Sequence, residues 1–121
     1  MSSDERATLD AVDRFNEAFN RHDVDAVMAA MTDDCVFEST SPPNGERHVG
    51  PAAVRAAWAA FFDSSPTARF DTEDLIATGD RAVAQWRYTW SDDGTERHVR
   101  GVDVMRVRDG KVAEKVSYVK G

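Results

Sequence analysis

The chain has 121 residues, and its 22 acidic and 15 basic side chains give a formal net charge of −7 at pH 7. This length supports one domain, predicted to span residues 1–121, and the 41% hydrophobic content excludes an intrinsically disordered chain. The acidic balance argues against nucleic acid and membrane surfaces as partners, because both attract a concentrated basic face.

Apolar residues recur at three- and four-residue steps near the N-terminus, which predicts an amphipathic helix. Ser2 and Glu5 have capping-box spacing, so the helix is expected to begin there and to end near residues 20–22. A second helix is predicted after Asp23, whose carboxylate can cap it. The predicted apolar faces of the two helices are Leu9, Val12, Phe15 and Phe19, then Val24, Val27, Met28 and Met31.

Residues 32–34 break the second helix, and residues 35–40 are predicted to form a short strand before a loop at residues 41–45. A third helix then begins at Gly50 and Pro51, because proline suits the first helical turn. It is expected to end at residues 63–66. Its predicted apolar face is Val54, Trp58, Phe61 and Phe62.

The hydrophobic period changes to two from Thr67 onward. Four strands are predicted at about residues 67–77, 81–91, 95–107 and 111–119, separated by turns rich in glycine and aspartate. Strands this close in sequence are joined by hairpins, so they form an antiparallel meander. Helices that precede a run of strands place the chain in the α+β class.

Cys35 is the single cysteine, so no internal disulfide can form and a reducing compartment is expected. No signal-peptide pattern follows Ser2, and the longest apolar run, residues 56–62, is too short to span a bilayer. We therefore predict a cytoplasmic protein.

Charge is distributed unevenly along the chain. Residues 1–34 hold nine acids and three bases, whereas the stretch from Arg97 onward holds seven bases and three acids. This asymmetry is typical of solvated faces that keep a protein soluble. Two further arrangements stay open: the two ends of the chain pack together, or the basic end faces an anionic ligand.

Four local motifs accompany this order of elements: HDVDA at residues 22–26, TDDCVFE at 32–38, GPAAVR at 50–55 and VDVMRVRDGKV at 102–112. With them the chain resembles the nuclear transport factor 2-like superfamily, in particular its SnoaL-like and ketosteroid-isomerase-like branch, over almost its whole length. The resemblance implies a cone-shaped α+β fold (a cystatin-like α+β barrel), in which a curved antiparallel sheet wraps around N-terminal helices and encloses a blind pocket. It also implies a homodimer through the outer face of the sheet.

Ketosteroid isomerases of this branch use a pocket tyrosine, an aspartate base and a protonated aspartate. By resemblance, these positions fall on Phe15, Ser39 and Asp103, so only the protonated acid is retained. Direct transfer of steroid isomerase activity is therefore rejected. The limonene-type epoxide hydrolases, with an Asp-Arg-Asp set, match less well: Arg87 could supply the arginine, but Thr89 and Ser117 replace the carboxylates.

Asp103 is the strongest catalytic candidate, because it interrupts a valine-rich strand that is expected to face the interior. An apolar pocket favours the protonated form of a carboxyl group, which suits a proton donor or a base near neutral pH. The ketosteroid isomerases, which the chain resembles, use a neutral carboxylic acid in this way. The alternative is a structural aspartate, ionised and paired across strands with Arg87 or Arg100.

Glu38 is the second catalytic candidate. Period-two geometry puts Val36, Glu38 and Thr40 on one face of the strand and Phe37 and Ser39 on the other. The register of the family turns Phe37 and Ser39 into the pocket, whereas a bulge would turn Glu38 inward instead.

Trp86, Tyr88 and Trp90 form an aromatic row on one face of a predicted strand. Alignment with the isomerases turns the row into the pocket, and alignment with the epoxide hydrolases turns it to the outer, dimer-forming face. In either position it is expected to make contacts. The predicted pocket residues are Phe15, Phe19, Met31, Phe37, Ser39, Trp58, Phe61, Trp86, Tyr88 and Met105.

The remaining reactive side chains favour structural roles. His22 is expected to be a cap or an exposed residue, and His48 and His98 are too far apart in sequence to indicate a metal site. Cys35 is expected to be a small buried apolar residue. Lys115 could pair with Asp103, but an exposed position is predicted for it.

The sequence therefore predicts a cofactor-independent enzyme of the SnoaL-like kind, with no metal. It would carry out isomerase-, cyclase- or lyase-type acid–base chemistry on a small hydrophobic or aromatic carbonyl compound, with Asp103 moving a proton at a developing enolate. The alternative is a non-catalytic module of the same fold that binds a small molecule or serves in dimerisation.

Overall fold

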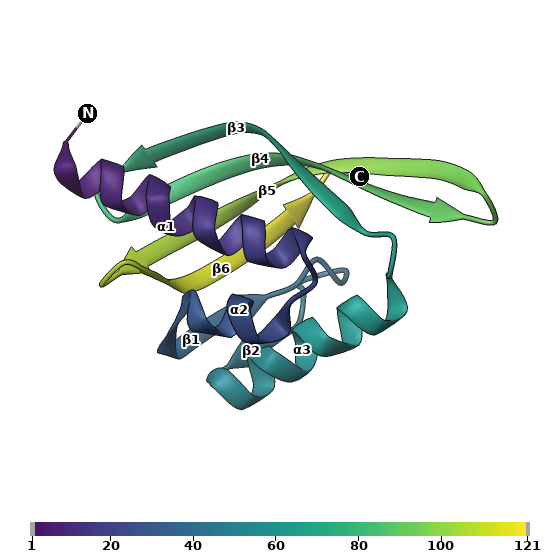
Figure 1. Cartoon of the computed structure of the whole chain (residues 1–121), viewed down its shortest axis with the longest axis horizontal. Helices are drawn as coiled ribbons and strands as arrows, with labels where there is room; N and C mark the ends of the chain where they lie inside the picture. The colour runs from purple at the N-terminus through teal and green to yellow at the C-terminus, as the bar shows by residue number, and fades with distance from the viewer. Residues whose placement is uncertain (1, 121) are drawn as a thin grey trace.

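The computed structural model describes residues 2–120, which form three helices and six strands. Figure 1 shows all of them, with the β4–β5 hairpin extending beyond the rest of the sheet. The helices are α1 (Ser3–Asn20), α2 (Val24–Ala29) and α3 (Pro51–Ser64). The strands are β1 (Met31–Glu38), β2 (Arg47–Val49), β3 (Arg69–Thr78), β4 (Arg81–Asp92), β5 (Thr95–Arg108) and β6 (Lys111–Val119).

The helix signals in the sequence are confirmed. The Ser2 hydroxyl accepts the Glu5 backbone N–H at 3.1 Å, and the Glu5 side chain accepts the Ser2 backbone N–H, which completes the capping box of α1. The Asp23 carboxylate caps α2 by accepting the Ala26 N–H. Pro51 lies in the first turn of α3.

The sheet has the order β2-β1-β6-β5-β4-β3, and β3 to β6 form the predicted antiparallel meander. One pairing departs from a fully antiparallel sheet, because β1 lies parallel to β6. A parallel neighbour requires a long crossover, and the chain between β1 and β6 supplies it. The two edge strands β2 and β3 do not pair, so the curved sheet stays open.

The region between α2 and β1 differs from its prediction. Met31 begins the strand rather than ending the second helix, and residues 32–34 lie inside β1. The β1–β6 register shifts between Met31 and Val36, so the strand is irregular there. Residues 32–34, which were predicted to end the second helix, lie in this irregular part. The three-residue strand β2, which pairs with the end of β1, lies between the predicted loop at residues 41–45 and the predicted start of the third helix, where no element was predicted.

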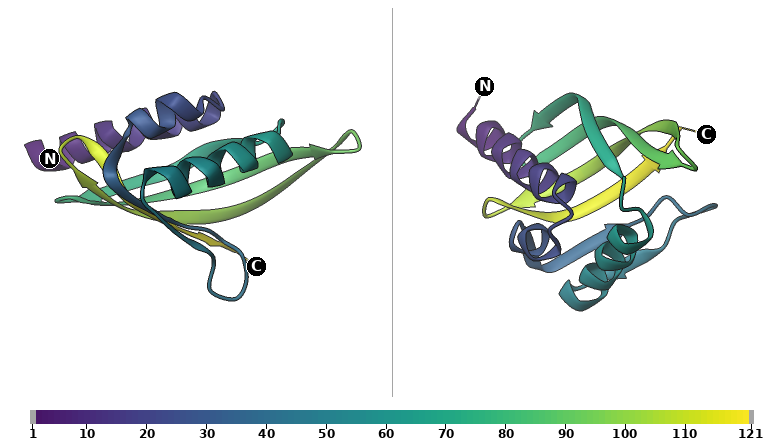
Figure 2. Two further views of the ribbon diagram at one scale, coloured as in Figure 1. Left: turned by 90° about the horizontal axis from the view of Figure 1, so that it is seen from below. Right: turned by 45° about the vertical axis from the view of Figure 1, so that its right-hand side comes forward.

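All three helices cover the concave face of the sheet, as Figure 2 shows from the side. The core lies between these layers and is built from the buried faces of α1 and α3 and the inward residues of the strands. Its largest fully buried side chains are Trp58, Phe15, Met31, Met105, Val12, Val27, Val54, Val112 and Cys35. No helix within residues 2–120 is long and apolar enough to cross a bilayer.

Gly101 on β5 leaves space for the side chain of Trp86. It lies directly opposite Trp86 of β4, and a Cβ at this position would come within 2.5 Å of the Trp86 ring and 2.3 Å of the Tyr118 carbonyl oxygen. Only glycine therefore allows the indole ring to come this close to the backbone of β5. This close approach fixes Trp86 against the concave face, where the functional site begins.

Candidate functional site

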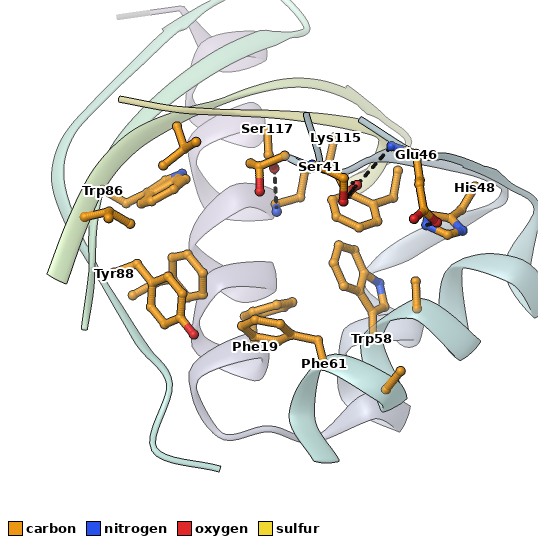
Figure 3. Close-up of a pocket in the computed structure, with 18 of the residues that line it drawn as sticks. Phe19, Ser41, Glu46, His48, Trp58, Phe61, Trp86, Tyr88, Lys115 and Ser117 are labelled. Atoms are coloured by element: carbon orange, nitrogen blue, oxygen red, sulfur yellow. Dashed lines mark hydrogen bonds and ion pairs between the residues drawn. The ribbon is translucent and has the colours of Figure 1, made fainter. Parts of the chain in front are cut away.

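A cavity of about 520 Å³ lies between the concave face of the sheet and helices α1 and α3 (Figure 3). Volumes of this size are typical of sites for small organic molecules. Most of the wall is apolar or aromatic, and hydroxyl, carboxylate, imidazole and ammonium groups occupy a few positions. The lining residues are Phe19, Phe37, Ser39, Thr40, Ser41, Glu46, His48, Ala57, Trp58, Ala60, Phe61, Phe70, Trp86, Tyr88, Trp90, Val99, Lys115, Ser117 and Val119.

The aromatic row of β4 faces this cavity. Trp86, Tyr88 and Trp90 all line it, whereas the alternate residue Gln85 is exposed on the convex face. Phe70 of β3 stacks on Tyr88 with ring centroids 4.6 Å apart and extends the row sideways. The pocket alternative for the row is therefore the one that the structure adopts, and the outer-face alternative is wrong.

Seven of the ten predicted pocket residues line the cavity: Phe19, Phe37, Ser39, Trp58, Phe61, Trp86 and Tyr88. The other three, Phe15, Met31 and Met105, do not. They are at most 2% exposed and pack in the core behind the wall, so their placement in the pocket is corrected. An inward-facing residue on this fold lines the cavity only where no second layer of side chains covers it.

Three side chains on β5 and β6 form a polar cluster on the sheet side of the cavity: Asp103, Ser117 and Lys115. Ser117 Oγ donates to Asp103 Oδ1 at 2.7 Å and accepts from Lys115 Nζ at 3.1 Å. The ammonium nitrogen lies 3.5 Å from Asp103 Oδ1. Asp103 and Ser117 are directly opposite in the β5–β6 register, and all three residues are buried.

Aromatic rings surround the ammonium group of Lys115. The nitrogen lies 4.9 Å from the centroid of Phe37, 5.1 Å from Trp58 and 5.5 Å from Phe19, which are distances typical of cation–π contacts. Lys115 is only 7% exposed, so the prediction that it is an exposed residue is wrong. The rings and the Asp103 carboxylate together offset the cost of burying its charge.

Asp103 lies behind the cavity wall. It borders a separate narrow hollow of about 20 Å³, together with Asn16 of α1 and Thr72 of β3, and does not line the main cavity. Its partners are Ser117 and Lys115, so the alternative pairing with Arg87 or Arg100 is not observed. Arg100 instead binds Glu73 on the convex face at 2.8 Å.

Glu38 is not in the cavity. Its side chain points to the convex side, where it lies 3.4 Å from the Arg47 guanidinium, while its neighbours Phe37 and Ser39 line the cavity. The irregularity in β1 lies before Val36, so the regular alternation of side chains holds at this end of the strand. The placement of Glu38 in the pocket is therefore corrected.

A second polar group lies at the solvent-facing rim. His48 of β2 lines the cavity, stacks nearly parallel on Phe37, and has Nε2 3.9 Å from a carboxylate oxygen of Glu46. The Ser39 hydroxyl accepts the Glu46 backbone N–H at 3.0 Å and ties this loop to the end of β1. His48 and Lys115 therefore lie on the two strands that flank Phe37, since each is a cross-strand neighbour of that residue.

Cys35 is completely buried in the core, as predicted, and this burial raises the pKa of its thiol. It is unsuited to act as a nucleophile. Within residues 2–120, no three histidine, cysteine, aspartate or glutamate side chains lie close enough together to hold a metal ion. His22 Nε2 donates to the Ala68 carbonyl oxygen at 2.8 Å and its ring stacks on Phe62, which makes it a structural residue.

Sequence reasoning missed Lys115, Ser117 and His48 as members of the site. The signal for Lys115 and Ser117 was their period-two spacing, which puts both on one face of the last strand; in the folded sheet Ser117 lies opposite Asp103 and Lys115 lies opposite Met105. The signal for His48 was weaker, because β2 has only three residues. Their shared location becomes visible only when β1, β2 and β6 are placed side by side.

The chain has relatives that match it over most of its length. A family model described as a SnoaL-like domain matches residues 12–115. An NTF2-like protein of unknown function from Mesorhizobium loti is 40% identical, with 100% of this chain and 97% of that chain covered and a TM-score of 0.84. No curated protein matches the chain significantly in sequence.

Two more distant structures share the fold. A candidate SnoaL-like polyketide cyclase from Jannaschia sp. CCS1 is 22% identical, with 99% of this chain and 90% of that chain covered and a TM-score of 0.86. TerC, co-crystallized with polyporic acid, is 18% identical, with coverages of 94% and 92% and a TM-score of 0.81. The α+β fold predicted from the order of elements is confirmed by these likenesses.

Proposed function

The chain belongs to the SnoaL-like family, and on that premise we propose that it is a cofactor-independent enzyme for acid–base chemistry on a small, flat, hydrophobic or aromatic carbonyl compound. The reaction would be of isomerase, cyclase or lyase type. The polar cluster at an aromatic cavity is the observation that carries this proposal. The aromatic walls hold the carbon skeleton, and the cluster supplies the proton transfer.

In this proposal, Asp103 and Ser117 have different tasks. Ser117 lines the cavity and Asp103 does not, so a proton that moves between substrate and Asp103 passes through the Ser117 hydroxyl. As Ser117 takes a proton from the carbon next to the substrate carbonyl, it gives its own proton to the Asp103 carboxylate. The reverse transfer returns the proton at the end of the reaction.

Two similar folds support a small-molecule ligand. One belongs to a candidate polyketide cyclase and one to a protein co-crystallized with polyporic acid. The cavity of this chain has the size and the mixture of aromatic and polar walls that such a ligand requires.

Deuterium exchange tests the proposal. The protein is incubated in D2O with 2-tetralone, and loss of the protons next to the carbonyl is followed by proton NMR. We expect exchange to be about a hundredfold slower in Ser117→Ala than in the wild type, because general acid–base catalysis contributes effects of this order. Ser91→Ala, at the exposed end of β4, is the matched control and keeps the wild-type rate.

Equal exchange rates in Ser117→Ala and the wild type would favour the second candidate, a non-catalytic small-molecule-binding module. The resemblance to ketosteroid isomerases supports that candidate, because it implies that Phe15 and Ser39 replace the tyrosine and the aspartate base. Binding of 2-tetralone without any exchange is the result that this module predicts.

We also propose that the convex face binds a second copy of the chain. Ile76, Val83, Val104 and Val116 are successive cross-strand neighbours on β3, β4, β5 and β6, and they form an apolar row. Ile76 is 60% exposed and Val83 is 38% exposed. Contiguous exposed apolar residues of this kind are typical of association surfaces.

A further inference from the structure

The charge of Lys115 is unusual for the wall of an apolar cavity. No arginine and no other lysine lines the cavity among residues 2–120. Lys115 belongs to the base-rich stretch from Arg97 onward, and the other bases of that stretch do not line the cavity. Its side chain is 9% exposed, and three aromatic rings hold the nitrogen in place.

The hydrogen bonds of Lys115 are incomplete. An ammonium group has three N–H donors, and one of them donates to Ser117 Oγ at 3.1 Å. The Asp103 oxygen at 3.5 Å is an ion-pair partner beyond ordinary hydrogen-bond length. At least one donor therefore faces only aromatic rings within the described residues, on a side chain that lines the cavity.

The position of Asp103 leaves this donor accessible to a ligand. Asp103 lies behind Ser117 and outside the cavity wall, so a molecule in the cavity meets the ammonium group before the carboxylate. An acceptor oxygen with a negative charge forms the stronger hydrogen bond with such a donor, particularly where water is excluded. Phe37, Trp58 and Phe19 would flank the same end of the ligand.

We propose that Lys115 anchors a single oxyanion, the carboxylate or ionised enol of a flat aromatic ligand, within the cavity. This inference rests on the function proposed above and names the class of molecule that the site takes. The acidic group bonds to Lys115 Nζ, and the rings of the ligand stack along Tyr88 and Phe70. Ser117 lies next to the anchor, which brings the acidic end of the ligand to the proton relay.

Two pairs of probes with matched shapes test the anchor. The first pair is 2-naphthoate and its neutral counterpart 2-naphthamide. The second pair is 2-hydroxy-1,4-naphthoquinone, whose enol is ionised at neutral pH, and 2-methoxy-1,4-naphthoquinone. Dissociation constants are measured by isothermal titration at fixed salt, and quenching of tryptophan fluorescence gives a second readout because Trp58, Trp86 and Trp90 line the cavity.

We expect the wild type to bind the anion of at least one pair about tenfold or more tightly than its neutral counterpart, as one charge-assisted hydrogen bond would provide. Lys115→Met removes this preference and leaves the affinity for the neutral probe within about threefold, because the methionine keeps much of the length of the side chain. Lys111→Met changes an exposed lysine of the same strand and keeps the preference. The probe pair whose charge preference is lost in Lys115→Met shows whether a carboxylate or an enolate is the preferred oxyanion.

Other outcomes separate the two proposals. Equal binding of charged and neutral probes, or a preference that survives Lys115→Met, would overturn the anchor and leave the aromatic cavity intact. Binding of neither pair would overturn the proposed function and the anchor together. If Lys115→Met unfolds because Asp103 loses its partner, the double variant Lys115→Met/Asp103→Asn carries the same test without a buried charge.

Discussion

The concave and convex faces of the sheet use alternate residues of the same strands, and each face holds an ion pair. On the concave face, the side chains of Lys115 and Asp103 are 9% and 6% exposed, and aromatic rings enclose the ammonium group. On the convex face, the side chains of Arg100 and Glu73 are 52% and 40% exposed. The distance is shorter in the exposed pair, 2.8 Å against 3.5 Å.

The distance between the charged atoms therefore does not show which ion pair contributes more to stability. Water screens the exposed charges, so their attraction contributes little to stability. The buried charges have lost their hydration, and each depends on the other and on nearby hydrogen bonds. The concave face thus holds a polar group that is available to a ligand, while the convex face combines ordinary surface pairs with the apolar row.

The largest effect is expected from removing one buried charge. Asp103→Asn leaves Lys115 buried without a counter-charge, so the free energy of unfolding should fall by about 3–5 kcal/mol. Urea denaturation followed by circular dichroism measures the change. The double variant Asp103→Asn/Lys115→Met should recover most of this loss, because no uncompensated charge remains. If Asp103→Asn were as stable as the wild type, the charge of Asp103 would not be needed to stabilise buried Lys115.

An intermediate effect is expected on the convex face. Val83→Lys puts a charge in the centre of the apolar row and should weaken the proposed dimer at least tenfold, or by about 1.4 kcal/mol. Sedimentation equilibrium over a range of concentrations measures this. Val49→Lys, at an exposed valine of the edge strand β2 outside the row, is the matched control. A wild type that sediments as a monomer would exclude the interface.

The smallest effect is expected from the exposed ion pair. The hydrogen bond from Arg100 lowers the pKa of Glu73 below its usual value, so the folded state keeps this carboxylate ionised at lower pH than the unfolded chain does. The contribution of Glu73 is therefore complete above the ordinary glutamate pKa and is lost as the pH falls through the lowered value.

Melting temperatures of the wild type and Glu73→Gln between about pH 6 and pH 3 test this sign. The small advantage of the wild type at the upper end should decrease toward the lower end. An advantage that grows on acidification would contradict the assignment, and Asp74→Asn provides a control at the next residue of β3.

Much of the fold could be predicted because its signals are local. The capping box of α1, the proline at the start of α3 and the turns between β3 and β6 each depend on a few neighbouring residues. The prediction failed where a pairing between distant segments decides the structure. Met31 joins β1, and Arg47–Val49 forms a strand, because β6 and β1 supply their partners.

The candidate site was predicted less completely, because the sequence does not show on which face of a strand a side chain lies. The sequence could not decide which face of the sheet Trp86 lies on, or whether Glu38 points inward. One irregularity in a strand moves every later side chain of that strand to the opposite face. The register of the folded sheet decides both.

By itself, the sequence determined the order of the three helices and of the strands other than β2, the α+β class and the resemblance to the SnoaL-like branch, since these depend on periodicity and short motifs. Only the tertiary structure decided that Lys115 is buried in the cavity wall. A lysine is ordinarily exposed, and its burial requires compensating groups that the sequence does not place near it. Phe19, Phe37, Trp58 and Asp103 come from four separate elements, and folding brings them around one nitrogen atom.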